Sequence, residues 1–148
     1  MYLLQPLPIA VLLLALLYAY LDWETREVPL WLLAVTAVIG VAYCISRGRQ
    51  PGSIAQALIP GIMMLLLSVL SDGALGTGDS VYICVMALFM SWQQVCLLLC
   101  AAFLLAGTAA LAITVRAVIR DRGIKQMTLP LLCFMPAGVI LAFYLTLQ

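Results

Sequence analysis

Two aspartates stand out in an almost uniformly apolar chain. Asp79 ends the tetrapeptide Gly76-Thr77-Gly78-Asp79, and Asp22 follows directly on the first hydrophobic segment. Burying a carboxylate in or near a membrane is costly, so an acid in such a place is a candidate functional group. When two carboxylates lie close together at low dielectric, one keeps its proton while the other ionises. Such a pair supplies an acid and a base together, which is the chemistry of an aspartic protease.

The composition indicates an integral membrane protein. Of the 148 residues, 66% are hydrophobic and 9% are charged, and the mean hydropathy is +1.20, which exceeds the range of soluble globular domains. The net charge is +1 with no long basic tract, so nucleic acid is excluded as a class of partner. The chain has no histidine, which excludes Ser-His-Asp triads, Cys-His dyads and the usual zinc sites that contain histidine.

The cysteines are interpreted as small core residues rather than as metal ligands or disulfide partners. They are odd in number, lie in apolar runs and form no C-x-x-C pair. Acidic residues near the two aspartates are too few to hold a cation. We therefore predict no metal site and no cofactor. The five cysteines are Cys44, Cys84, Cys96, Cys100 and Cys133.

The hydrophobic segments predict an all-α, polytopic membrane protein with about six transmembrane helices in one domain, residues 1–148. We interpret the first segment as a spanning helix rather than a cleaved signal peptide, because no basic residue precedes it and its apolar run is long. The stretch 80–115 is too short for two full spans and a turn, so its first helix should be short. The expected spans are Leu3–Leu21, Val28–Ser46, Ile54–Ser71 with a kink at Pro60-Gly61, two within Ser80–Val115 separated at residues 91–94, and Thr128–Leu147.

The basic residues predict the orientation of these spans. In an up-and-down bundle of six helices, the loops after the first, third and fifth helices lie on one side, which carries five of the seven basic residues. By the positive-inside rule this side is cytoplasmic. Asp22 and Asp79 then both face the cytoplasm at a similar depth. The cytoplasmic group is Arg26, Arg116, Arg120, Arg122 and Lys125, and the opposite side has Arg47 and Arg49.

Each aspartate also has an ordinary structural interpretation. Asp22 could be a solvated loop charge at the end of the first helix. Asp79 could be the N-cap of the short helix that it opens, because aspartate is a preferred cap and favours the helix macrodipole. Asp72 is a competing acid, but it precedes the glycine turn and is expected at the membrane interface.

The motifs resemble those of the type IV prepilin and preflagellin peptidases, the GxGD aspartyl proteases of membranes. Gly76-Thr77-Gly78-Asp79 matches the G-x-G-D motif, and residues 22–29, from Asp22 to Pro29, look like the family's first aspartate with its basic stretch and Ile-Pro-Asn-like step. The proline-rich segment 129–138 is similar to the family's final helix. The chain has Val81 where many members have lysine, and Leu30 where they have asparagine or aspartate.

The resemblance implies an aspartic endopeptidase that removes the short basic leader of type IV prepilin-like proteins. Cleavage is expected at the cytoplasmic face of a bacterial or archaeal membrane, in pilus assembly or secretion. Larger members carry an insertion with C-x-x-C motifs and also methylate the product, and nothing here matches that insertion, so we expect a peptidase-only form. The implied site consists of Asp22 and Asp79 as catalytic residues, Gly76, Thr77 and Gly78 as the active-site loop, and Arg26, Pro29 and Pro136 as substrate-binding residues.

Two alternatives stay open from the sequence. A presenilin-like intramembrane protease also uses two aspartates, but Pro136-Ala137-Gly138 only half matches the Pro-Ala-Leu motif of that class. A non-catalytic helical subunit of a pilus or secretion assembly would instead pair Asp22 and Asp79 with Arg26 or another base for structural reasons. Substrate cleavage distinguishes an enzyme from such a subunit.

Overall fold

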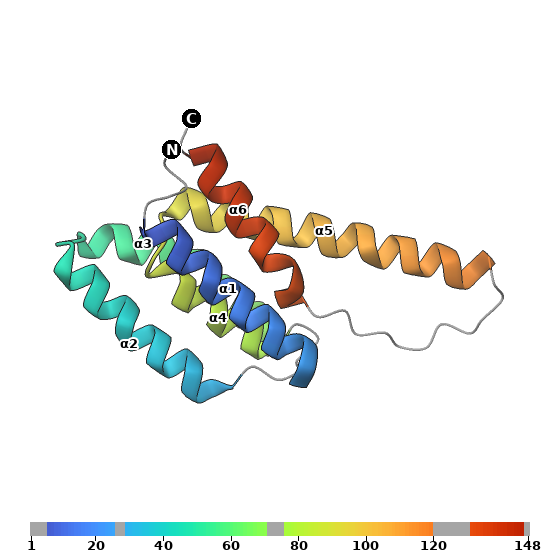
Figure 1. Cartoon of the computed structure of the whole chain (residues 1–148), viewed down its shortest axis with the longest axis horizontal. Helices are drawn as coiled ribbons and strands as arrows, with labels where there is room; N and C mark the ends of the chain where they lie inside the picture. Colours follow the sequence, from blue (N-terminus) through green and yellow to red (C-terminus); the bar gives the residue numbers. More distant parts are fainter. Residues whose placement is uncertain (1–5, 26–28, 71–75, 120–130, 147–148) are drawn as a thin grey trace.

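The structure, a computed structural model, describes residues 6–25, 29–70, 76–119 and 131–146 (Figure 1). Within these ranges the chain forms six α-helices and one short 3-10 helix, with no strand. The predicted all-α, polytopic membrane class is therefore confirmed. The elements are α1 (Pro6–Thr25), α2 (Leu30–Ser46), α3 (Pro51–Leu70), α4 (Thr77–Ala87), α5 (Trp92–Ile119), η2 (Leu131–Phe134) and α6 (Met135–Thr146).

The helices differ in whether they are long enough to cross a membrane. By length and composition, three described segments can do so: Leu7–Glu24, Pro51–Leu70 and Trp92–Arg116. Helix α2 and the segment Leu132–Thr146 are shorter apolar helices. Helix α4 has only 11 residues, about 16 Å at 1.5 Å per residue, so the prediction of a short helix at this place is confirmed. In Figure 1 the second half of α5 extends beyond the other helices.

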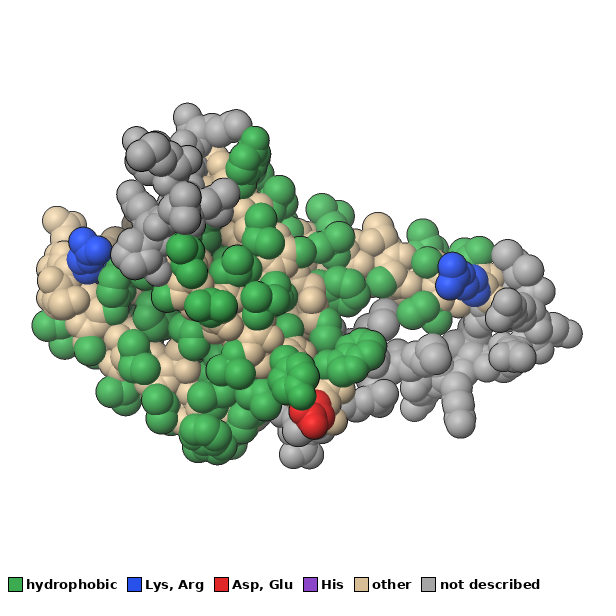
Figure 2. Space-filling view, in the orientation of Figure 1, with side chains coloured by type: hydrophobic (Ala, Val, Ile, Leu, Met, Phe, Trp, Pro, Cys, Tyr) green, Lys and Arg blue, Asp and Glu red, His purple; other side chains and the backbone are tan. Residues whose placement is uncertain are grey.

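The bundle is held by close packing between neighbouring helices. Helix α5 packs on α6, α3 packs on α4, and α1 packs on both α6 and η2. Two glycines permit close approaches: a Cβ at Gly61 would lie 2.6 Å from Cys84 Sγ on α4, and one at Gly138 would lie 2.8 Å from Leu98 O on α5. Helix α3 is continuous through Pro60. Hydrophobic side chains are spread over the described helices in Figure 2, and many large ones are exposed, as in a protein surrounded by lipid.

The last predicted span differs from the structure. We expected a helix from Thr128, but residues 128–130 lie outside the described part, and the α-helix begins at Met135 after the 3-10 turn of η2. Pro136 explains this start, because proline lacks an amide hydrogen and is tolerated only in the first turn of a helix. The result is a helix of 12 residues, about 18 Å long.

The cysteines and tryptophans lie partly as expected. Cys44 is buried, whereas Cys100 is exposed on α5, so the interpretation as a core residue is wrong for Cys100. The tryptophans are exposed near helix ends, where interfacial anchors are found. They are Trp23, Trp31 and Trp92.

Candidate active site

Asp22 is buried inside α1 and is not a loop charge. It lies one turn before the helix ends at Thr25, and only 7% of the residue is exposed. Its burial follows from the helical period, because Asp22 continues the stripe of buried residues Val11, Ala15 and Tyr18 at spacings of three and four. Within the described part of the chain, its Oδ2 atom is buried without a hydrogen-bond partner. A buried oxygen of this kind is available to a substrate or a water molecule.

Asp79 lies in the first turn of α4, directly beside the glycine that starts this helix. The N-cap is Gly76, which makes no side-chain cap hydrogen bond, so the interpretation of Asp79 as the N-cap is wrong. The Asp79 carboxylate folds back over Gly76: a Cβ on that glycine would lie 3.1 Å from Oδ2 and 3.4 Å from Cγ. Glycine at position 76 therefore leaves the space that the carboxylate occupies.

The protonation of Asp79 is strongly affected by its surroundings. Asp79 lies on the short helix α4, which is not one of the three segments long enough to span a membrane. Burial, assisted by the negative charge of Asp22, raises the pKa of the Asp79 carboxyl to about 6. The contribution from Asp22 means that the two carboxyl groups are close enough to interact electrostatically. Near neutral pH such a pair can hold one proton between its two members.

A pair of tyrosines fixes α1 against α4 next to the aspartates. Tyr18 and Tyr82 are fully buried, and their ring centroids lie 5.0 Å apart in an edge-to-face arrangement with an interplanar angle of 67°. Tyr18 precedes Asp22 by four residues, and Tyr82 follows Asp79 by three. Each acid therefore lies about one helical turn from its tyrosine. Because the two helices run in opposite directions here, both acids lie on the same side of the tyrosine pair.

A hydrogen-bond chain connects this tyrosine pair to α2. The Thr36 hydroxyl donates to Leu32 O at 2.7 Å, and the Tyr18 hydroxyl lies 2.7 Å from Thr36 Oγ1. A threonine hydroxyl has one hydrogen, so Tyr18 must be the donor to Thr36. In the described residues the buried Tyr82 hydroxyl has no partner. Contacts among α1, α2 and α4 thus hold the helix turns that carry the two acids at the same depth in the bundle.

The predicted loop residues and Pro29 lie at the starts of α4 and α2. Gly76, the N-cap of α4, and Thr77 are exposed, and Gly78 is half-buried. We expected these three residues to form a loop, but Thr77 and Gly78 belong to the first turn of α4. Pro29 is the N-cap of α2 and lies about 10 Å along that helix from Thr36, toward the same end of the bundle as Asp22.

The remaining two predicted substrate-binding residues are less informative. Pro136 is buried in the first turn of α6, which packs on α1 and α5. Arg26 and the competing acid Asp72 lie outside the described residues. The described residues also contain no group of three or more histidine, cysteine or acidic side chains that could hold a metal ion.

A comparison with known protein families decides the identity of the chain. Residues 9–111 match the type IV leader peptidase family, a range that covers more than half of the chain and includes Asp22, Asp79 and the glycine loop between them. The chain belongs to the type IV leader peptidase family. No curated protein and no solved structure matches it. Membership of this peptidase family, together with the apolar helices, makes the chain an integral membrane protein with a leader peptidase-like function.

The tyrosine pair and Thr36 are features of the structure that the sequence interpretation missed. The available signal was positional: a tyrosine one turn before Asp22 and another one turn after Asp79, each on the same helix face as the acid. Both tyrosines belong to apolar runs, where an aromatic residue is ordinary. Only their contact across α1 and α4 distinguishes them.

Proposed function

We propose that this leader peptidase is an aspartic endopeptidase with Asp22 and Asp79 as its catalytic pair. The observation that carries the proposal is that Asp22 and Asp79, from separate helices, each lie about one turn from the buried Tyr18–Tyr82 contact. The raised pKa of Asp79, about 6, supports it. A group tuned toward neutral pH in a partly dry site is typical of general acid–base catalysis. The proposal extends the family assignment to particular residues.

In the proposed mechanism the two carboxyl groups have complementary roles. The ionised member removes a proton from a water molecule as that water attacks the scissile carbonyl carbon. The protonated member donates its proton to the developing oxyanion or to the leaving amine. Because the pair titrates as a unit, either Asp22 or Asp79 can start as the base. The unpartnered Asp22 Oδ2 supports this scheme, since it can bind the attacking water.

The proposed substrate is a type IV prepilin-like protein with a short basic leader before an apolar helix. Five basic residues lie in the segments expected on the same side as the aspartates, which supports a cytoplasmic active site. Pro29 is the N-cap of α2, and we assign it, with Arg26 and Pro136, to substrate binding. The assignment of these three residues rests on the family motifs.

A cleavage assay tests the proposal. The purified protein in detergent or liposomes is mixed with a prepilin-type substrate, alongside the variants Asp22→Asn and Asp79→Asn. We expect each variant to lose about a hundredfold to ten-thousandfold in turnover, as removal of an acid–base group does. Glu24→Gln is the matched control, because Glu24 is an exposed acid on the same helix as Asp22 and should retain turnover.

Two results would contradict this proposal. Full turnover by either Asp→Asn variant would exclude a catalytic role for that residue. Failure of the folded wild-type protein to cleave several leader-bearing substrates would favour the non-catalytic subunit. A substrate that lacks the basic leader tests the presenilin-like alternative. If the protein cleaves this substrate within its apolar helix as fast as it cleaves the leader-bearing substrate, the protein is a presenilin-like protease.

A further inference from the structure

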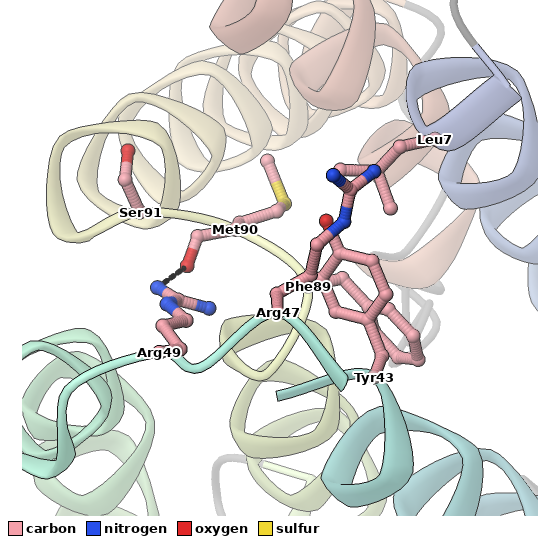
Figure 3. A pocket seen from close by; sticks show the side chains of 7 residues that line it. All are labelled: Leu7, Tyr43, Arg47, Arg49, Phe89, Met90 and Ser91. Atoms are coloured by element: carbon pink, nitrogen blue, oxygen red, sulfur yellow. Dashed lines mark hydrogen bonds between the residues drawn. The ribbon is translucent and has the colours of Figure 1, made fainter. Parts of the chain in front are cut away.

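A second feature lies at the opposite end of the bundle, far from the aspartates. It is a pocket of about 390 Å³ formed by the start of α1, the end of α2 and the connection between α4 and α5 (Figure 3). Leu7 and Asp22 both lie on α1, and about 1.5 Å of rise per residue separates them by roughly 22 Å. The pocket is therefore not part of the acid pair. Its lining residues are Leu7, Tyr43, Arg47, Arg49, Phe89, Met90 and Ser91.

Arg49 forms a fixed wall of this pocket. The turn before it is a Schellman motif, in which Gly48 adopts a φ of 58°, Gly48 N bonds Ile45 O and Arg49 N bonds Cys44 O at 3.0 Å. The guanidinium then donates to Leu88 O at 2.8 Å and to Met90 O at 2.5 Å. These carbonyl groups at the end of α4 carry only partial negative charge, so the full positive charge of Arg49 is not neutralised.

Arg47 is the exposed cation of the pocket. Its guanidinium carbon lies 5.8 Å from the centroid of the Tyr43 ring, and Figure 3 shows the side chain extending past the Tyr43 and Phe89 rings toward Leu7. This guanidinium makes no hydrogen bond or ion pair with any of the described residues. Its five N–H donors are therefore available to a ligand.

The charge around the pocket selects an anion. The acidic residues that the structure describes are Asp22, Glu24 and Asp79, which all lie at the other end of their helices. Two arginines without a neighbouring described carboxylate attract a phosphate, which the planar guanidinium binds through two parallel hydrogen bonds. The same two charges repel the ammonium of a zwitterionic headgroup.

The apolar part of the lining identifies what the phosphate is attached to. Tyr43 and Phe89 pack with ring centroids 5.9 Å apart, and Leu7 and Met90 complete the apolar wall. Ile39 and Val35 precede Tyr43 on α2 by four and eight residues, and both are exposed apolar side chains on the lipid-facing surface that leads away from the pocket. A free phosphate ester would leave this wall unused, whereas an acyl chain would cover it.

We propose that the pocket between Arg47 and Arg49 binds the phosphate of an anionic phospholipid, with Arg47 as the principal donor. The lipid occupies the membrane surface opposite to the active site. Basic pockets between membrane helices are suited to such headgroups. The site is independent of the assignment of the catalytic residues.

Lipid binding can be measured on the purified protein in neutral detergent. Native mass spectrometry gives the occupancy of phosphatidylglycerol and of phosphatidylcholine with identical acyl chains. Glycerol phosphate is measured in the same way, as a phosphate ester without acyl chains. We expect phosphatidylglycerol to be preferred, and Arg47→Gln to reduce this preference by about fivefold or more, since a charge-assisted hydrogen bond is lost. Arg47→Lys should retain part of the preference, because it keeps the charge but not the two-point geometry.

Arg116→Gln is the matched control. Arg116 is also an exposed arginine in the last turn of a helix, but it lies on the far part of α5, and its loss should leave the preference unchanged. Equal binding of the two lipids, an unchanged preference in Arg47→Gln, or an equal loss in Arg116→Gln would overturn the proposal. Glycerol phosphate binding as tightly as the lipid would show that the site takes free phosphate esters and would overturn the lipid assignment. Unfolding temperatures in lipid-free detergent confirm that the variants are folded.

Discussion

Replacing Gly76 by alanine tests whether the glycine loop positions the Asp79 carboxylate. The new Cβ would lie 3.1 Å from Asp79 Oδ2, whereas ordinary contacts begin at 3.4 Å. The φ angle of Gly76 is −58°, which alanine adopts without strain. The carboxylate oxygen must therefore move by about 0.3 Å or rotate away. The backbone can stay where it is.

The expected effect is a loss of turnover with little change in substrate binding. A misplacement of about 1 Å can cost about a hundredfold in rate, so a shift of about 0.3 Å should lower kcat by about three- to tenfold. The assay is the cleavage reaction with kcat and KM measured separately. Gly107→Ala is a control, because a Cβ at Gly107 meets nothing within 4 Å.

A serine at position 76 separates this steric effect from an effect on the helix end. Serine brings the same Cβ but is a much better N-cap than alanine, a difference of about 1 kcal/mol. If the contact with Asp79 controls turnover, Gly76→Ser and Gly76→Ala should lose activity together. Wild-type kcat in Gly76→Ala, or recovery of wild-type kcat in Gly76→Ser, would refute the reasoning.

Two predictions concern stability. Asp79→Asn should raise the unfolding temperature at pH 8 but not below about pH 4. The pKa of the Asp79 carboxyl is raised to about 6 in the folded state. As pH rises from about 4 to about 6, this carboxyl group therefore lowers the free energy of unfolding by about 1–3 kcal/mol, and asparagine avoids this loss. Equal effects of the substitution at both pH values would contradict this prediction. Gly61→Ala should lower the free energy of unfolding by about 1–3 kcal/mol through overpacking, because its Cβ would lie 2.9 Å from Cys84 N. Gly107→Ala is the control and should be neutral or stabilising in the same thermal unfolding experiment. Equal losses of stability in both variants would refute the packing argument.

The positions of the helices could be predicted from apolar runs, and their ends could be predicted only where a residue restricts the backbone. Helices α2 and α4 begin at Leu30 and Thr77, rather than at the expected Val28 and Ser80. The residues directly before them, Pro29 and Gly76, explain these starts, because proline and glycine act locally on the chain. The end of α1 was placed too early, since the apolar run stops at Leu21 while nothing at Asp22 to Thr25 breaks a helix. Hydropathy locates the change in polarity, which need not coincide with the end of the helix.

The two aspartates could be selected from the sequence, but their surroundings could not. Motif spacing identifies Asp22 and Asp79, whereas burial of Asp22 depends on which face of α1 meets the other helices. That face is set by tertiary contacts such as Tyr18 with Tyr82 and Thr36, which join residues far apart in the chain. A single sequence with several apolar faces does not determine which of them pack together.

A structural ion pair and a catalytic acid pair make opposite demands on Asp79. A neighbouring cation would lower the pKa of its carboxyl, whereas burial beside a second carboxylate raises it. The pKa is raised to about 6, and the two causes are burial and the charge of Asp22. Ionised Asp79 therefore weakens the fold, which a residue retained for stability alone would not do. An acid that destabilises its own fold near neutral pH, yet lies beside the exposed start of α4 at Gly76, favours the enzyme over the non-catalytic subunit.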